Sequence, residues 1–240
     1  SKWASEFVVR EAGRRGLKGA IIRPGYVTGD AETGVTNTDD FLVRILKGCV
    51  QLKSRPDISN GINMVSVGHV ARVVVASTVH PAKETLGVSQ VTGHPRMSFN
   101  DFVGCLETYG YGVPKVEYRK WCEDMAHYVD VSAAEEMEEH ALLPLFHHVT
   151  SDLPNDSKAP ELDDGNAVQA LKSDERWTGE DVSAGKSVDA EIVGVYLAYL
   201  MAVGFMKAPN GEGKAKLPAV ELSGEQREAM GKIGGRGGAV

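Results

Sequence analysis

The sequence lacks several features that would each assign it to a class of protein. Its three cysteines are odd in number and widely spaced, which argues against a disulfide framework and favours reduced thiols. No apolar run approaches the roughly 20 residues that a membrane-spanning helix needs, and no signal peptide is visible. The net charge of −7 disfavours general binding of nucleic acid. These absences predict a soluble cytoplasmic domain.

A glycine-rich phosphate-binding turn is also missing. No G-x-G-x-x-G or related pattern follows a predicted strand anywhere in the 240 residues. In nucleotide-binding α/β folds, that turn comes after the first strand of the sheet. Strand-like and helical segments nevertheless alternate, which is typical of a parallel sheet. The sequence therefore predicts only the later part of such a fold.

The first half of the chain contains the clearest α/β pattern. A helix is predicted at 3–15, with Trp3, Phe7 and Val8 near one stripe, and a short β-branched strand at 20–22 follows it. A second helix is predicted at 38–49, with Thr38 as its N-cap. Helix, turn and apolar strand together make an α/β unit.

The pattern continues with a strand that ends at Val67 and a helix at about 68–80, which has Val70, Val73, Val74 and Ser77 on its buried face. Further predicted elements are a strand at 87–93, a helix that begins at Ser98 with Asp101 in a partial capping box, helices within 116–129 and 132–146, and an apolar helix at 189–206.

Three segments in this order resemble a known family. "SKWASE" is followed about twenty residues later by "IIRPGYVTG" and then by "NMVSVGHVAR". The order resembles the extended short-chain dehydrogenases/reductases, in which a tyrosine lies four residues before a helical lysine. Positions i and i+4 share a helix face, and a nearby cation stabilises a phenolate. The resemblance implies that Lys2 is the catalytic lysine, which also binds the nicotinamide ribose, and that its tyrosine would precede Ser1.

Longer segments narrow the resemblance to the terminal thioester-reductase domain of carrier-protein enzymes, and in particular to the fungal L-2-aminoadipate reductases. These segments are "SKWASEFVVREAGRRGL", "RPGYVTG", "GHPRMSFNDFVGCLETYGYGVPKVEYRKW" and "WTGED". The resemblance implies that NADPH reduces a phosphopantetheine-bound acyl thioester on a carrier protein and releases an aldehyde, here the semialdehyde of 2-aminoadipate in lysine biosynthesis. It also implies that the N-terminal half of the reductase domain is a partner, without which this chain should be inactive.

Site residues follow from the same resemblance. Pro24, Gly25 and Val27 match the loop that passes beside the nicotinamide, although an ordinary turn between a strand and a loop remains an alternative. Tyr26 and Thr28 could line the thioester pocket or simply pack within the loop. For Lys2, the alternative is a surface lysine on an amphipathic helix.

The expected fold is therefore α/β: the C-terminal part of an extended Rossmann-type reductase with a mostly helical substrate-binding subdomain. Its predicted segments are the Rossmann-like core at 1–95, the helical subdomain at 96–150, an acidic loop or linker at 151–188, C-terminal helices at 189–232 and a flexible tail at 233–240. The linker assignment depends on ten acidic against four basic residues in 151–190.

Other conspicuous residues favour structural roles. A metal site at the histidines is not expected, because no further ligands are placed with them and adjacent side chains point in different directions. The cysteines lack the basic neighbours that would favour a thiolate. The residues concerned are His140, His147 and His148, and Cys49, Cys105 and Cys122; core packing is expected for Tyr109, Tyr111 and Trp121.

Two other functions are compatible with parts of the sequence. A nucleotide-sugar epimerase or dehydratase would share the lysine and the R-P loop, but the segment "YGYGVPKVEYRKW" resembles the thioester reductases instead. A non-catalytic module that docks a carrier protein would explain the missing phosphate-binding turn. Neither alternative calls for a nucleic-acid or membrane partner.

Overall fold

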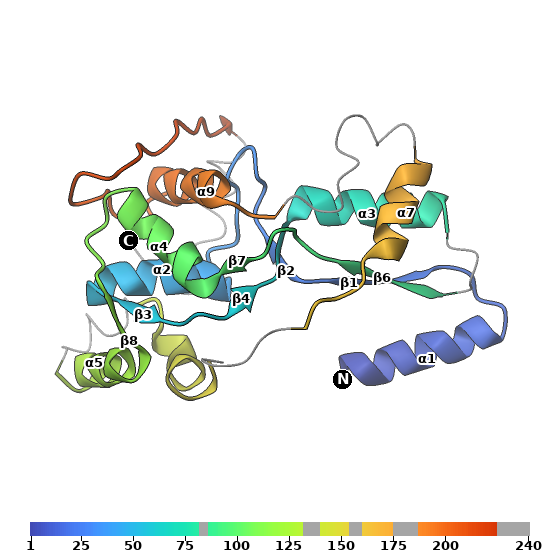
Figure 1. Ribbon diagram of the computed structural model, residues 1–240, viewed down its shortest axis with the longest axis horizontal. Coiled ribbons are helices and arrows are strands. Elements are labelled where there is room, and N and C mark those ends of the chain that lie inside the picture. The colour runs from blue at the N-terminus through green and yellow to red at the C-terminus, as the bar shows by residue number, and fades with distance from the viewer. Residues whose placement is uncertain (82–85, 132–139, 154–159, 175–186, 225–240) are drawn as a thin grey trace. The chain divides into compact units, whose positions relative to one another are not determined.

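The structure is a computed structural model that describes residues 1–81, 86–131, 140–153, 160–174 and 187–224 (Figure 1). The chain divides into two compact units that are interleaved along the sequence. The first unit comprises Ser1–Thr28, Gly61–Met97 and Ala159–Val188, and the second comprises Gly29–Asn60, Ser98–Lys158 and Asp189–Val240.

Parallel strand pairs form the framework of the first unit. Strand β1 (Ala20–Pro24) pairs with β6 (Gly87–Val91), and β2 (Tyr26–Thr28) pairs with β5 (Met64–Ser66). The register sets Pro24 opposite Val91 and Tyr26 opposite Met64. The short strands β4 (Gly61–Ile62) and β7 (Met97–Ser98) also pair. The predicted parallel α/β arrangement is confirmed.

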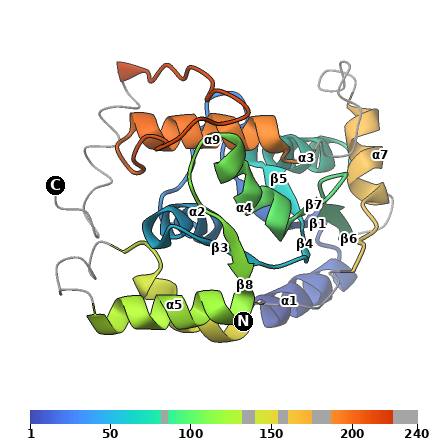
Figure 2. The same cartoon turned by 60° about the vertical axis from the view of Figure 1, so that its left-hand side comes forward.

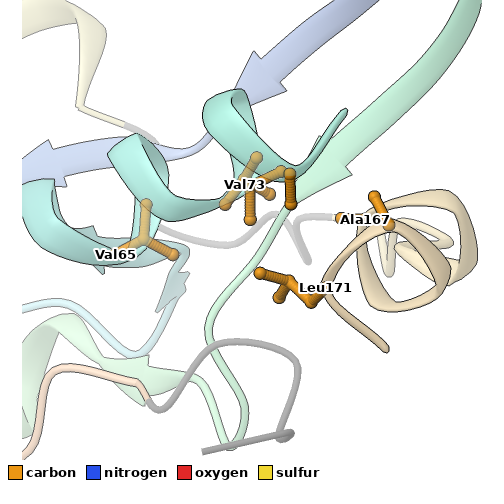
Figure 3. Close-up of a cluster of buried hydrophobic side chains, with 7 residues drawn as sticks. Val65, Val73, Ala167 and Leu171 are labelled. Atoms are coloured by element: carbon orange, nitrogen blue, oxygen red, sulfur yellow. The ribbon is translucent and has the colours of Figure 1, made fainter. Parts of the chain in front are cut away.

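Helices lie on both sides of the β1–β6 pair. Helix α1 (Lys2–Arg14) lies on one side and α3 (Val67–Val79) on the other, as Figures 1 and 2 show. Helix α7 (Gly165–Ser173) packs against α3 and β6. Figure 3 shows the resulting core, which joins strand, α3 and α7 side chains. Its labelled members are Val65, Val73, Ala167 and Leu171.

Helix α3 was predicted almost to the residue. Ser66 caps it by accepting a hydrogen bond from the His69 amide at 3.4 Å. Of the four predicted core positions, Val73 and Ser77 are buried and Val70 is half-buried against the core cluster. The prediction for Val74 was wrong, because this side chain is exposed on the outer face. A run of three valines cannot all face the core of a helix with 3.6 residues per turn.

The first helix is confirmed, but its apolar stripe is not covered by the described residues. Trp3 is 81% exposed, Phe7 53% and Val8 65%, and α1 has no buried residue. Trp3 and Phe7 stack on each other, with ring centroids 6.1 Å apart. Core packing therefore does not hold α1 in place within the described part of the chain.

Part of the predicted acidic linker is instead a helix of the first unit. Helix α7 contributes Ala167, Ala170 and Leu171 to the buried cluster. The acidic composition of 151–190 did not indicate this short amphipathic helix, because its apolar residues are mostly small. Its neighbours at 154–159 and 175–186 lie outside the described residues.

The second unit is mostly helical within the described residues, and it includes Gly29–Asn60, which was predicted as part of the Rossmann-like core at 1–95. Helix α4 (Phe99–Thr108) packs against α9 (Ala190–Ala202) and α2 (Phe41–Leu52), as Figure 2 shows. Helix α5 (Tyr118–Val131) packs on the parallel pair of β3 (Arg55–Asp57) and β8 (Lys115–Glu117). The described residues of this unit also form a 3₁₀ turn, η1 (Leu143–Leu145), and a π-helical turn, η2 (His148–Asp152). The predicted helix at 132–146 lies largely outside the described residues.

Helix caps explain where the elements of the second unit begin. Asp40, and not the predicted Thr38, caps α2 by accepting from the Leu42 amide at 2.8 Å. The predicted capping pair is confirmed, since Ser98 accepts from the Asp101 amide at 3.0 Å. Asp189 caps α9 through the Ile192 amide at 2.9 Å.

Within the described residues, no helix is both long enough and apolar enough to span a membrane.

Candidate functional site

The candidate site lies at the carboxyl edge of β1, where the chain passes through Gly25 into β2. The Gly25 amide donates to the Val91 carbonyl at 3.0 Å, and the Tyr26 amide donates to the Asn63 carbonyl at 2.8 Å. The carboxyl ends of β1 and β6 therefore lie side by side. In open parallel sheets, this edge is where ligands bind.

Asn63 joins three chain segments at this edge. Besides accepting from Tyr26 with its backbone, it accepts from the Gly93 amide with Oδ1 at 3.1 Å. A Cβ on Gly25 would lie 2.4 Å from the Asn63 carbonyl oxygen, so only glycine fits there without movement. Asn63 was not predicted as a site residue; a polar residue between two short apolar strands is the signal that could have drawn attention to it.

The loop and strand after Gly25 combine exposed and half-buried side chains. Tyr26 is 48% exposed and Val27 is 39% exposed, and Pro24 is also exposed. Thr28 is half-buried, and its hydroxyl donates to the Val65 carbonyl at 3.1 Å. Tyr26 and Val27 are thus accessible on the surface, whereas Thr28 packs within the fold through its hydrogen bond.

An ion pair ties the helix that begins with Lys2 to the end of β1. Lys2 is exposed at the start of α1, one helical turn before Glu6. Glu6 accepts from Arg23 Nε at 2.9 Å and from Arg23 Nη2 at 2.5 and 2.7 Å. Arg23 directly precedes Pro24. The first turns of α1 and the end of β1 are therefore tied together beside the loop.

The ion pair shifts the pKa of both of its members toward the charged form. The hydrogen bond from Arg23 is the main cause that holds the pKa of Glu6 below its usual value, and the same bond raises the pKa of Arg23. Both groups therefore stay charged at neutral pH. Neither residue was predicted as part of the site, because the contact joins positions 17 residues apart.

A second polar cluster follows β6. His94 Nε2 lies 2.9 Å from Thr92 Oγ1 and 3.1 Å from Asp164 Oδ2, and the Thr92 hydroxyl donates to the same Asp164 oxygen at 3.1 Å. Asp164 occupies the N-cap position of α7 but makes no cap hydrogen bond. The cluster thus connects the loop after β6 to the start of α7.

A hollow of about 320 Å³ lies elsewhere on the first unit. It is lined by Arg10, Gly13, Arg14 and Leu86. Leu86 immediately precedes β6, so this hollow lies toward the amino edge of the sheet, away from the carboxyl edge. The hollow is therefore separate from the candidate site at Gly25.

The cysteines and His140 lie outside this edge. Burial raises the pKa of Cys49 to about 12 and that of Cys105 to about 11, so both thiols are protonated at neutral pH. The buried His140 accepts from the Leu142 amide through Nδ1 at 3.2 Å. The predicted core positions of Tyr109, Tyr111 and Trp121 are confirmed by their burial.

Solved structures define the class of protein. The terminal R domain of the myxalamid PKS-NRPS pathway matches with a TM-score of 0.72 and 28% identity, over 87% of this chain and 50% of that one. The thiolation-reductase di-domain of an archaeal non-ribosomal peptide synthetase shares the fold, with a TM-score of 0.61 and 20% identity over 83% of this chain and 39% of that one. The fold of the chain thus matches part of a reductase domain of the extended short-chain dehydrogenase/reductase type.

Curated sequences identify the particular relatives. The chain is homologous to fungal L-2-aminoadipate reductases. It is 54% identical to the large subunit from Penicillium chrysogenum, over 99% of this chain and 17% of that protein. It is 52% identical to the Saccharomyces cerevisiae enzyme, over 94% of this chain and 16% of that protein. The chain therefore spans about a sixth of the length of these relatives.

A family model covers the part of the chain that contains the site. Residues 1–74 match the NAD-binding family described as male sterility protein. The match includes α1, β1, β2 and the loop at Pro24–Val27. Together with the fungal relatives, it confirms the family resemblance that the sequence motifs indicated.

Proposed function

We propose that this chain is the substrate-binding, C-terminal part of an NADPH-dependent reductase that releases a carrier-bound acyl thioester as an aldehyde. The observation that supports this function best is the ion pair between Glu6, one helical turn after Lys2, and Arg23, the residue before Pro24, at the carboxyl edge of a parallel sheet. The fungal relatives and the R-domain fold favour thioester reduction over nucleotide-sugar chemistry.

The residues of this edge fit part of a nicotinamide cofactor. The exposed Lys2 ammonium would bind the ribose hydroxyls, and the exposed surface of Val27 and the backbone at Gly25 would lie against the nicotinamide ring. The bound cofactor supplies a hydride to the thioester carbonyl. No glycine-rich phosphate-binding turn exists within these 240 residues, so the pyrophosphate would be bound by the N-terminal half of the domain, the proposed partner.

The chemical role of this chain is electrostatic. As the carbonyl carbon is reduced, negative charge develops on its oxygen, and the Lys2 cation stabilises that charge directly and by favouring the ionised form of a neighbouring phenol. In the extended short-chain dehydrogenases/reductases, this phenol belongs to a tyrosine four residues before the lysine. Collapse of the resulting hemithioacetal releases the thiol and the aldehyde.

The proposed substrate is 2-aminoadipate, bound as a phosphopantetheine thioester on a carrier protein and reduced to its semialdehyde for lysine biosynthesis. Support comes from the printed names of the fungal relatives and from the archaeal structure in which a thiolation domain and a reductase domain occur together. Tyr26 and Thr28 are the proposed contacts of the acyl group. Within the cell, we propose a cytoplasmic location.

The test compares substrates in the natural polypeptide that contains residues 1–240. NADPH oxidation is followed with an aminoadipyl-pantetheine thioester, with other acyl thioesters and with nucleotide sugars, and the aldehyde is trapped and identified. We expect oxidation to depend on the aminoadipyl thioester and to yield one aldehyde per NADPH. Turnover of nucleotide sugars alone would overturn the proposal, and carrier-protein binding without NADPH binding would favour a docking module.

A further inference from the structure

We infer that the Glu6–Arg23 ion pair is a positioning element that sets Lys2 against the loop after β1. The inference deepens the proposed function and rests on it for its kinetic consequences. Its structural consequence, the placement of the start of α1, can be measured without turnover.

The geometry of the pair is specific. Arg23 approaches Glu6 with two nitrogens, Nε at 2.9 Å from Oε2 and Nη2 at 2.5 Å from Oε1. A planar guanidinium that meets both oxygens of a carboxylate fixes orientation as well as distance. Among the first ten residues, Glu6 alone is not exposed. The pair is therefore an oriented contact in the described structure.

Both ends of the pair are close in the chain to the proposed site residues. Glu6 follows Lys2 by four residues, so the two share a helix face and their Cα atoms lie about 6 Å apart along the helix. Arg23 is bonded covalently to Pro24, the first residue of the proposed nicotinamide loop. If the pair shifted, Lys2 would move relative to Pro24, because only one helical turn and one peptide bond separate the pair from these two residues.

Apolar packing cannot take over this task within the described residues, because α1 has no buried residue. The far end of the helix touches Leu86 closely, since a Cβ on Gly13 would lie 2.1 Å from Leu86 Cδ1. The near end is tied to the strand by Arg23. Exposed ion pairs contribute little to stability. We therefore expect the loss of this pair to change the position of the start of α1 more than the free energy of unfolding.

The same carboxylate offers a matched control. Glu6 also accepts from Arg10 Nε at 3.0 Å, but Arg10 lies on α1 itself and cannot relate the helix to the strand. Removing Arg10 deletes one ion pair of Glu6 and leaves the contact between α1 and β1 in place.

The experiment uses the natural polypeptide with Arg23→Gln, Glu6→Gln, Arg10→Gln and the charge-exchanged double variant Glu6→Arg/Arg23→Glu. For Arg23→Gln and Glu6→Gln, we expect kcat/KM for NADPH to fall at least tenfold, with the unfolding midpoint changed by no more than about 2 °C. Arg10→Gln should stay within twofold of the parent. The exchanged variant should recover at least threefold over Arg23→Gln.

Hydrogen exchange separates this inference from the proposed function. Amides of residues 5–9 should exchange faster in Arg23→Gln but not in Arg10→Gln. If the parent does not reduce thioesters, the proposed function fails, and the exchange data alone decide the positioning role. Unchanged exchange, an active parent with unaltered kcat/KM in Arg23→Gln, or an equal loss in Arg10→Gln would overturn the inference.

Discussion

At the scale of single residues, Gly25 shows how a missing side chain brings two strands together. Its place between β1 and β2 allows the Asn63 carbonyl to approach the backbone. Because a Cβ there would lie 2.4 Å from a backbone oxygen that cannot move alone, the loop depends on glycine.

Gly25→Ala should therefore destabilise the first unit by about 1–3 kcal/mol and lower NADPH-dependent turnover. The matched control is Gly68→Ala in α3, where an added Cβ meets nothing within 4 Å. This control should be neutral or stabilising by up to about 1 kcal/mol, because alanine favours a helix. Chemical unfolding of both variants measures the difference, and equal stability of the two would contradict the account of the loop.

Sequence reasoning could find some of the site residues and not others. Lys2, Pro24 and Gly25 lie within short motifs, so order and spacing were enough to single them out. Asn63 and the Glu6–Arg23 pair act through contacts between distant positions, which a motif does not record. The Thr92–His94–Asp164 cluster spans 72 residues and was beyond prediction for the same reason.

At the scale of elements, α4 and α9 are held together by a close approach at Gly194. A Cβ on Gly194 would lie 2.2 Å from Tyr109 Oη, and the Tyr109 hydroxyl donates to the Ala190 carbonyl at 2.9 Å. Tyr109 therefore fills the space that glycine leaves on α9. The two helices belong to the same unit, so this contact is part of its core.

Gly194→Ala should destabilise the second unit by about 1–3 kcal/mol, because the added methyl group displaces the Tyr109 ring. Tyr109→Phe removes only the hydroxyl and its hydrogen bond, and should cost about 1 kcal/mol. If the clash is the cause, the double variant Gly194→Ala/Tyr109→Phe should be more stable than the sum of the two losses predicts. Strict additivity in denaturant unfolding would show that the clash is not the cause.

The prediction of elements was most accurate where periodicity and cap agreed. Helix α3 combined the Ser66 cap with a valine stripe, and α4 combined Ser98 with Asp101. Helix α2 begins three residues after its predicted start, because Asp40, which is nearer the apolar run than Thr38, supplies the cap. Helix α7 was missed because the acidic composition around it dominated the signal.

At the scale of the whole molecule, stability should depend on pH through His140. Burial, followed by the nearby Lys47 charge, lowers the pKa of His140 from 6.5 to about 4. The folded state therefore holds the imidazole neutral where the unfolded chain would protonate it. Stability from this group is fully present above pH 6.5 and is lost as the pH falls toward 4.

The loss should amount to about 3 kcal/mol between pH 6.5 and pH 4, measured as the free energy of unfolding in denaturant at several pH values. Asparagine can keep the hydrogen bond from the Leu142 amide without titrating, so His140→Asn should flatten the curve in this window. The carboxylates with lowered pKa, such as Glu6 and Asp57, lose their contributions at the acid end of this window and below it, as the pH falls through their ordinary pKa values of 4.5 and 3.8. A slope that His140→Asn leaves unchanged would show that another group is responsible.

At the same scale, we propose that Lys2 is part of a reductive site that the loop after β1 completes. The most direct test is the rate of NADPH oxidation with an aminoadipyl-pantetheine thioester by the natural polypeptide, for Lys2→Met and for the control Lys18→Met, another exposed lysine of the same unit. We predict a loss of about 100-fold or more for Lys2→Met and a rate within twofold of the parent for Lys18→Met. Equal rates for the two variants would contradict the account.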